Sequence, residues 1–282
     1  MRLIEFSKVQ DFLALTQDTL ELNESANNLI LGICFQLRDE PECYLEAPFL
    51  AAVLDEQEQV ILCAVMTPPY PLLIQGYAEP DKASNVLIEH LLKAHWRLPG
   101  VNGQKDIAEA FAHLWQVHAG YTPHLTMSQR VYEIRRVVMP PIPEGHFRRA
   151  CKQDKDLLIS WFVAFAKEAM GKEKSSVDVG RIIVAVDMGN AYVWERAGKL
   201  VSMAFRQRPI SHSVSVSGVY TPPQERKKGY ASACVAKLSQ LLLDEGFAFI
   251  NLFTDLANPI SNDIYQKIGY KPICGFDRYS FD

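Results

Sequence analysis

The sequence lacks the features that mark membrane and nucleic-acid-binding proteins. No apolar run approaches the roughly 18 residues that a membrane-spanning helix needs. Basic residues are not in excess, because 29 lysines and arginines stand against 33 aspartates and glutamates, for a net charge of −4. Proteins that bind nucleic acids or membrane surfaces normally carry a basic excess. We therefore expect neither a nucleic acid nor a membrane as a partner.

Metal and nucleotide motifs are also missing. The histidine pairs His90/His95 and His113/His118 are each spaced five apart, so neither pair shares a helical face as in His-Glu-x-x-His. No Cys-x-x-Cys pair, P-loop or Gly-x-Gly-x-x-Gly sequence occurs. We expect no metal site, and we expect the cysteines to be free thiols: Cys34, Cys43, Cys63, Cys151, Cys234 and Cys274. Glu5 and Asp11 come too early for a signal peptide, so the expected location is cytoplasmic.

What the chain does have is enough length and apolar content for two domains. It has 282 residues, 48% of them hydrophobic, and domains average about 150 residues. Pro140, Pro141 and Pro143 cannot continue a helix or a central strand, so 138–145 is predicted to be a linker. The predicted domains are residues 1–140 and 145–282.

The two halves repeat one order of elements. Hydrophobic periodicity in the second half predicts a helix at 154–170 and a hairpin of two strands at 191–195 and 200–205. It then predicts a strand at 213–220, a helix at 229–244, a strand at 247–253, a helix at 259–268 and an extended end at 270–281. After a helical region, the first half predicts strands at 49–54, 60–66 and 71–75, helices at 84–97 and 103–117, and a strand at 125–136. This pattern indicates a duplicated unit, with chance similarity as the alternative.

The strongest local signal is a basic turn that runs into an apolar helix. The strand 213–220 is followed by Arg226-Lys227-Lys228-Gly229-Tyr230-Ala231, and an apolar stripe begins directly afterwards. The first turn of a helix has unpaired N–H groups and the positive end of the helix dipole. Gly229 and Ala231 would let a ligand approach the backbone. The turn suits a pyrophosphate, and the alternative is a solvated basic turn before an ordinary helix.

This stretch resembles the acyl-CoA-binding motif of the Gcn5-related N-acetyltransferases (GNAT), Arg/Gln-x-x-Gly-x-Gly/Ala. Val219-Tyr-Thr-Pro222 resembles the strand end that precedes this motif in the family. A second family signature, Asn-x-x-Ser/Ala-x-x-x-Tyr-x-x-x-Gly-Phe/Tyr, is similar to the segment from Asn258 through Tyr265 to Gly269-Tyr270. The resemblance covers about 145–282. It implies an α/β (α+β) fold of two GNAT-type units, each a mixed, mostly antiparallel twisted sheet flanked by helices.

The resemblance also implies acetyl-CoA as the cofactor and a role for each matching residue. Backbone groups of Val219, Tyr220 and Thr221 would pair with the pantetheine arm. The N–H groups from Arg226 through Lys227, Lys228, Gly229 and Tyr230 to Ala231 would hold the pyrophosphate. Asn258 would contact the pantetheine or position the next helix, and the alternative is a plain helix N-cap.

Tyr265 matches the family's general acid, which protonates the thiolate of CoA. A phenol suits this role because it is neutral at pH 7 and donates one hydrogen bond. The alternative is a packed helical aromatic. The family's frequent strand glutamate is missing, since the strand offers Ser213, Ser215 and Ser217. Glu168 and Glu195 are the nearest candidates for a base, with surface charges as the alternative, and a neutral amine could attack directly.

The first half lacks these groups. Its corresponding turn carries Glu79 and Asp81, which would repel a pyrophosphate, and Pro80 removes a backbone donor. We interpret residues 1–140 as a degenerate GNAT-like domain that walls the acceptor cleft. The predicted function is an N-acetyltransferase acting on an amine of a small molecule or an amino terminus. The alternative is a non-catalytic acyl-CoA-binding or sensing protein. Acceptor identity and oligomeric state stay open.

Overall fold

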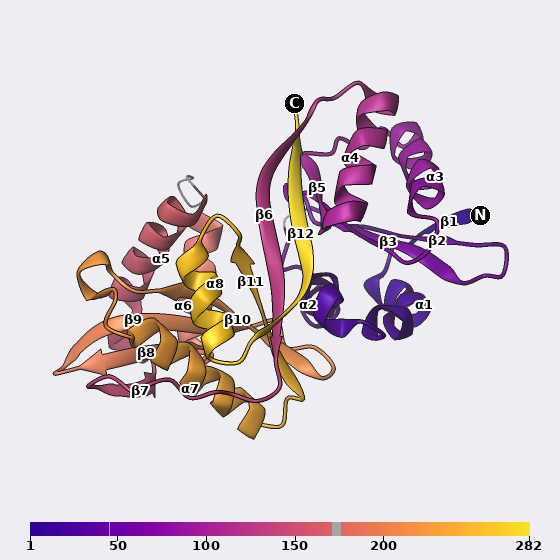
Figure 1. Cartoon of the computed structure of the whole chain (residues 1–282). Coiled ribbons are helices and arrows are strands. Elements are labelled where there is room, and N and C mark those ends of the chain that lie inside the picture. Colours follow the sequence, from indigo (N-terminus) through magenta and orange to yellow (C-terminus); the bar gives the residue numbers. More distant parts are fainter. Residues whose placement is uncertain (45, 171–175) are drawn as a thin grey trace. The chain divides into compact units, whose positions relative to one another are not determined.

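The computed structural model describes residues 1–44, 46–170 and 176–282, which form two compact units (Figure 1). Unit 1 contains Met1–Val131 together with Ile273–Asp282, and unit 2 contains Tyr132–Pro272. Each unit is a twisted, mixed and mostly antiparallel sheet flanked by helices, so the predicted fold class is confirmed. Within the described ranges, no helix is long and apolar enough to cross a membrane.

Unit 1 is built on the strand order β1-β2-β3-β4-β5-β12, with β6 beside β12. β1 with β2, β2 with β3, β3 with β4 and β5 with β12 pair antiparallel, whereas β4 and β5 pair parallel. The elements are β1 (Arg2–Glu5), α1 (Val9–Glu21), α2 (Glu24–Asp39), β2 (Phe49–Leu54), β3 (Val60–Met66), β4 (Leu72–Gly76), α3 (Pro80–Lys93), β5 (Gly100–Gln104), α4 (Lys105–Ala119), β6 (Pro123–Ile134) and β12 (Lys271–Phe281).

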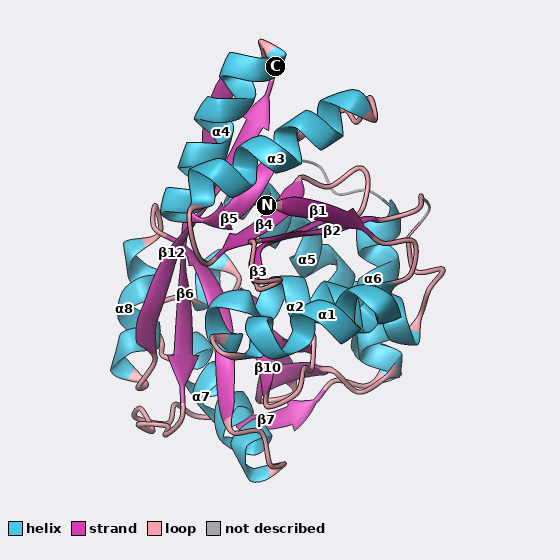
Figure 2. Ribbon diagram, turned by 90° about the vertical axis from the view of Figure 1, so that its right-hand side faces the viewer, coloured by secondary structure: helices cyan, strands magenta, loops and turns pink. Residues whose placement is uncertain are grey.

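The sheet of unit 1 is covered by helices on both faces. Leu87 and Leu91 of α3 and Phe111 and Trp115 of α4 are buried against one face. The helices α1 and α2 lie side by side on the other face (Figure 2). Since both faces are covered, β2 is fully buried, as its uninterrupted apolar sequence predicts.

Unit 2 has the strand order β7-β8-β9-β10-β11, and the last residues of β6 follow β11. The helices α7 and α8 cover one face and α5 and α6 the other. Its elements are β7 (His146–Arg149), the 3-10 turn η1 (Lys152–Asp154), α5 (Lys155–Met170), α6 (Ser176–Asp187), β8 (Ala191–Arg196), β9 (Lys199–Gln207), β10 (Ser213–Tyr220), the 3-10 turn η2 (Pro223–Glu225), α7 (Tyr230–Asp244), β11 (Phe249–Asp255) and α8 (Pro259–Lys267).

The repeated order of elements is confirmed. In each half an antiparallel hairpin (β2-β3 or β8-β9) leads to a third strand, a helix and a strand parallel to the third one. A second helix and a long final strand complete each repeat. A parallel neighbour requires a crossover connection, and here α3 and α7 supply it.

The final strands cross the predicted domain boundary. β12, which ends the second repeat, pairs antiparallel with β5, from Phe276 opposite Gln104 to Ser280 opposite Gly100. Residues 273–282 therefore belong to unit 1, while the end of β6 belongs to unit 2. The predicted ranges 1–140 and 145–282 follow the proline linker, whereas the compact units differ from them because they exchange these strand segments.

Some local predictions differ from the structure. The helix predicted at 84–97 begins at Pro80, because proline is tolerated in the first turn, and ends at Lys93, before His95 at φ 58°. The short strands β1, β5 and β7 and the helix α6 were not predicted. β5 contains Gly100 and Gly103, which allow neighbouring backbones to approach. A Cβ on Gly103 would lie 2.7 Å from the Ile74 carbonyl oxygen.

Candidate active site

The predicted site begins where two parallel strands of unit 2 part. β10 and β11 are paired at Ser213–Ser215 opposite Phe249–Asn251. Beyond this point β10 runs on to Tyr220 and β11 to Asp255 with no further pairs between them. Unpaired strand edges offer backbone groups that an extended ligand can use as a strand would.

A bulge distorts β10 in this unpaired segment. Its register with β9 shifts between Ser217 and Tyr220, and Gly218 has φ +57°, where a Cβ would lie 2.7 Å from the Phe205 ring. This bulge re-aims the part of the strand that carries Val219, Tyr220 and Thr221.

Ser202 of β9 supports the end of β10. Its hydroxyl donates to the Tyr220 carbonyl oxygen at 3.2 Å and accepts from the Thr221 hydroxyl at 2.9 Å. Sequence reasoning missed Ser202, because its role depends on the β9–β10 register and leaves no local signal. The three predicted pantetheine-contacting residues thus lie together at a fixed strand end.

The turn before α7 presents unpaired N–H groups. Gly229 is the N-cap in the left-handed region at φ 84°, and Lys227 also has a positive φ of 63°. The bond from the Ala233 N–H to the Gly229 carbonyl, at 3.0 Å, is the first of the helical pattern. Over the described residues, no bond is recorded for the N–H groups of 227–232. The Arg226 N–H donates to the Pro223 carbonyl at 3.3 Å, so the available donors begin one residue later than predicted.

The three cations of the turn differ in what they contact. The Arg226 guanidinium points back toward α5, with Nη2 2.6 Å from Glu168 Oε2 and Nε 2.9 Å from the Thr221 carbonyl oxygen. Lys228 pairs with Glu225 at 2.9 Å. No ion pair of Lys227 is recorded with any described residue. The side chain of Arg226 therefore braces the turn, and Lys227 is the cation most available to a ligand.

Asn258 has the role of a helix cap. Its Oδ1 accepts the Ser261 N–H at 3.1 Å at the start of α8, and Pro259 follows in the first helical position. This geometry fits the alternative that the sequence offered. Contact of Asn258 with the pantetheine stays a prediction.

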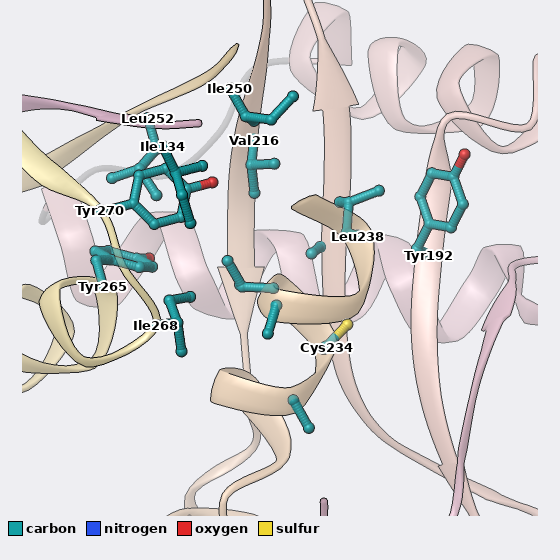
Figure 3. Packing of buried hydrophobic residues seen from close by; sticks show 14 of the residues in the cluster. Ile134, Tyr192, Val216, Cys234, Leu238, Ile250, Leu252, Tyr265, Ile268 and Tyr270 are labelled. Carbon is teal, nitrogen blue, oxygen red and sulfur yellow. The ribbon is translucent and has the colours of Figure 1, made fainter. Parts of the chain in front are cut away.

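Tyr265 of α8 lies in the core of unit 2, with 8% of its surface exposed. Its ring meets Tyr270 edge to face at 6.0 Å (Figure 3). Burial raises the pKa of Tyr265 to about 12 because the charged phenolate is poorly solvated there. The phenol is therefore neutral at pH 7, as a proton donor must be. The ring packs in the core, as the alternative predicted, and the role of Tyr265 as a general acid stays a prediction.

The candidate bases are both bound to arginines. Glu168 accepts from Arg226 and, at 3.4 Å, from the Tyr220 hydroxyl. Glu195 lies in the β8–β9 hairpin, and its Oε2 is 2.6 Å from Nε of Arg148 in β7. Each of the two carboxylates therefore forms an ion pair with an arginine.

The equivalent turn of unit 1 is built differently. Glu79 takes the left-handed N-cap place of α3 at φ 43° and pairs with Lys82 at 2.9 Å. A Cβ on Gly76 would lie 3.4 Å from Ile107, so this side chain occupies the space beside the end of β4. The turn is acidic and the space beside it is filled.

Residues 158–270 match the model of the acetyltransferase (GNAT) family. Unit 2 therefore carries a GNAT domain, and the predicted family is confirmed for this part of the chain.

Solved structures extend the similarity in fold to the whole chain. A GNAT-family acetyltransferase from Colwellia psychrerythraea is 9% identical with a TM-score of 0.63, and each chain covers 100% of the other. A Drosophila protein is 12% identical with a TM-score of 0.69, over 99% of this chain and 98% of that one. A tandem GNAT protein from the clavulanic acid biosynthesis pathway is 11% identical with a TM-score of 0.59, over 99% and 97%. A search of curated protein sequences found no match.

Proposed function

We propose that unit 2 is an acetyl-CoA-dependent N-acetyltransferase acting on an amine of a small molecule or an amino terminus. The observation that carries this proposal is the turn at 227–232. Its N–H groups have no recorded partner among the described residues, and it follows β10, the strand that parts from β11, after the short turn η2. Pyrophosphate binding at a helix N-terminus and strand-like binding of an extended arm both require such groups.

The residues of the chain fit an acyl-CoA, which supplies the acyl group as a reactive thioester. The N–H groups of Lys227 to Ala231 would hold the pyrophosphate, and Lys227 would add countercharge. The edge of β10 at Val219–Thr221 would align the pantetheine arm. Tyr265, kept neutral by burial, would donate its proton to the leaving thiolate.

The acceptor amine would enter neutral and attack directly. Glu168 and Glu195 are both held by arginines, and β10 presents serines rather than a carboxylate. The same observation favours a second candidate, a non-catalytic acyl-CoA-binding protein. Turnover separates the two functions.

The test is an amine-acceptor screen that detects released thiol, run on the parent and on two glycine variants. Gly229→Glu places a carboxylate at the turn, whereas Gly198→Glu makes the same change in the β8–β9 hairpin. Both glycines are left-handed, at φ +84° and +74°, and neither has an atom closer than 4.0 Å to an added Cβ.

We expect the parent and Gly198→Glu to release CoA with at least one acceptor, and Gly229→Glu to lose both turnover and the thermal shift produced by CoA. CoA binding without release across the screen would favour the sensor. Unchanged binding by Gly229→Glu would remove the pyrophosphate site.

A further inference from the structure

The first repeat contributes a residue to the core of unit 2. β6 belongs to the first repeat, yet its last residues, Tyr132–Ile134, lie in unit 2. Tyr132 and Ile134 are both buried in the same cluster as Tyr265 and Tyr270. Figure 3 shows Ile134 beside Leu252 and Tyr270.

The hydroxyl of Tyr132 bonds α8 at two points. It donates to Asn262 Oδ1 at 3.1 Å and accepts from Gln266 Nε2 at 3.2 Å. A phenol has one donor and can accept as well, so both functions of this hydroxyl are used. The two partners lie one helical turn apart on α8.

The direction of these bonds is fixed by the neighbouring groups. Asn262 Nδ2 donates to the carbonyl oxygens of Asp255 at 3.0 Å and Asn258 at 2.8 Å. Its oxygen therefore faces Tyr132, because the reverse amide orientation would set oxygen against two carbonyls. Tyr132 must then donate to Asn262, which leaves its lone pairs for Gln266. The chain of bonds joins β6, α8 and the β11–α8 loop.

The helix α8 is also anchored by apolar packing, since Ile264 packs against the same cluster and Ile268 at its C-cap is buried. Tyr265 is the only buried residue recorded within α8. Asn262, Tyr265 and Gln266 are spaced i, i+3 and i+4, so they share one face of the helix. Rotation of α8 about its axis, or translation along it, would therefore move the hydroxyl of Tyr265.

We propose that Tyr132 is a positioning residue, which fixes α8 through Asn262 and Gln266 and so sets the place of Tyr265. The part that concerns catalysis rests on the proposed function, whereas the fixing of α8 does not. The first repeat then contributes to the candidate active site of the second through the strand segment that enters unit 2.

The test compares Tyr132→Phe with Tyr192→Phe in the full chain. Tyr192 is 1% exposed in the same cluster, and its hydroxyl accepts one bond of 3.4 Å from Arg149. Hydrogen exchange of the α8 amides is measured first, without cofactor. Losing two hydrogen bonds should speed this exchange roughly five- to thirtyfold in Tyr132→Phe, while Tyr192→Phe leaves it unchanged. Gln266→Met, which removes one exposed partner, should give a smaller effect in the same direction.

The second measurement is kinetic. Tyr132→Phe should lower kcat at least several-fold while the Kd for CoA, measured by calorimetry, stays within about twofold. Parent-like α8 exchange in both Tyr132→Phe and Gln266→Met would overturn the proposal, and so would faster exchange with parent-like kcat. If the parent turns over no acceptor, the proposed function fails and the exchange result alone decides whether Tyr132 fixes α8.

Discussion

The two units contain the same connection between a strand and a helix, but the side chains of this connection differ. In both, a strand leads through a left-handed N-cap into a helix that crosses to a parallel strand. In unit 2 this N-cap is Gly229, in a basic turn beside strands that part. In unit 1 it is Glu79, in an acidic turn beside the filled space at Ile107.

The second helix of each repeat shows the same contrast. A Gly-Tyr pair follows each helix, Gly120-Tyr121 directly after α4 and Gly269-Tyr270 one residue after the end of α8, with both glycines in the left-handed region. Four residues before the glycine, α8 carries the buried Tyr265, whereas α4 carries the exposed Gln116. The two repeats therefore share their backbone arrangement and differ in the side chains at a few positions.

Replacing Tyr265 should have the largest effect. Tyr265→Phe should lower turnover by about 10² to 10⁴-fold, the usual contribution of general acid catalysis, while the Kd for CoA changes no more than a few-fold. Gln116→Leu is the matched change in unit 1 and should leave both constants unaltered. Steady-state kinetics and calorimetry check this, and normal turnover in Tyr265→Phe would leave the residue a packing role only.

The buried phenol should also make stability depend on pH. Burial raises the pKa of Tyr265 from 10 to about 12, so above pH 10 the unfolded chain loses a proton that the folded chain retains. The free energy of unfolding should then fall between pH 10 and 12, by on the order of 1 to 3 kcal/mol from this residue.

Denaturant unfolding at pH 9.5 and 11.5 measures this contribution. Tyr265→Phe should lose less stability over the interval than the parent. Tyr121→Phe changes the 42% exposed tyrosine of unit 1 and should lose as much as the parent. Equal losses in all three proteins would show that Tyr265 is not protected by burial.

The smallest effect is expected at the N-cap of unit 1. Glu79→Gly relieves a left-handed backbone that glycine adopts freely and removes only an exposed pair with Lys82. We expect the free energy of unfolding to rise by roughly 0.5 to 1 kcal/mol. We also expect no second CoA site, because Ile107 still fills the adjacent space. A gain in CoA stoichiometry would show that Glu79 alone closes this site.

The sequence was informative where structure follows from local pattern. The strand at 213–220, the start of α8 and the turn that leads into α7 were all predicted from periodicity, capping residues and motif spacing. β5 was missed because Gly100 and Gly103 have low strand propensity, and its neighbours in the sheet impose the conformation. The roles of Ser202 and Tyr132 depend on contacts between strands and helices far apart in the chain. The pairing of β12 with β5 also depends on such contacts, whereas the strand itself was predicted as the extended segment 270–281.

We expect the doubled fold to carry a single acyl-CoA site, and calorimetric titration of the intact chain with CoA measures the number of sites. The intact chain is required because β12 belongs to unit 1, so a cut after the linker would remove a strand from its sheet. We predict saturation at one CoA per chain, and no binding after Gly229→Glu. Two sites per chain would show that unit 1 also binds CoA, and one site that survives Gly229→Glu would show that the turn before α7 does not bind it.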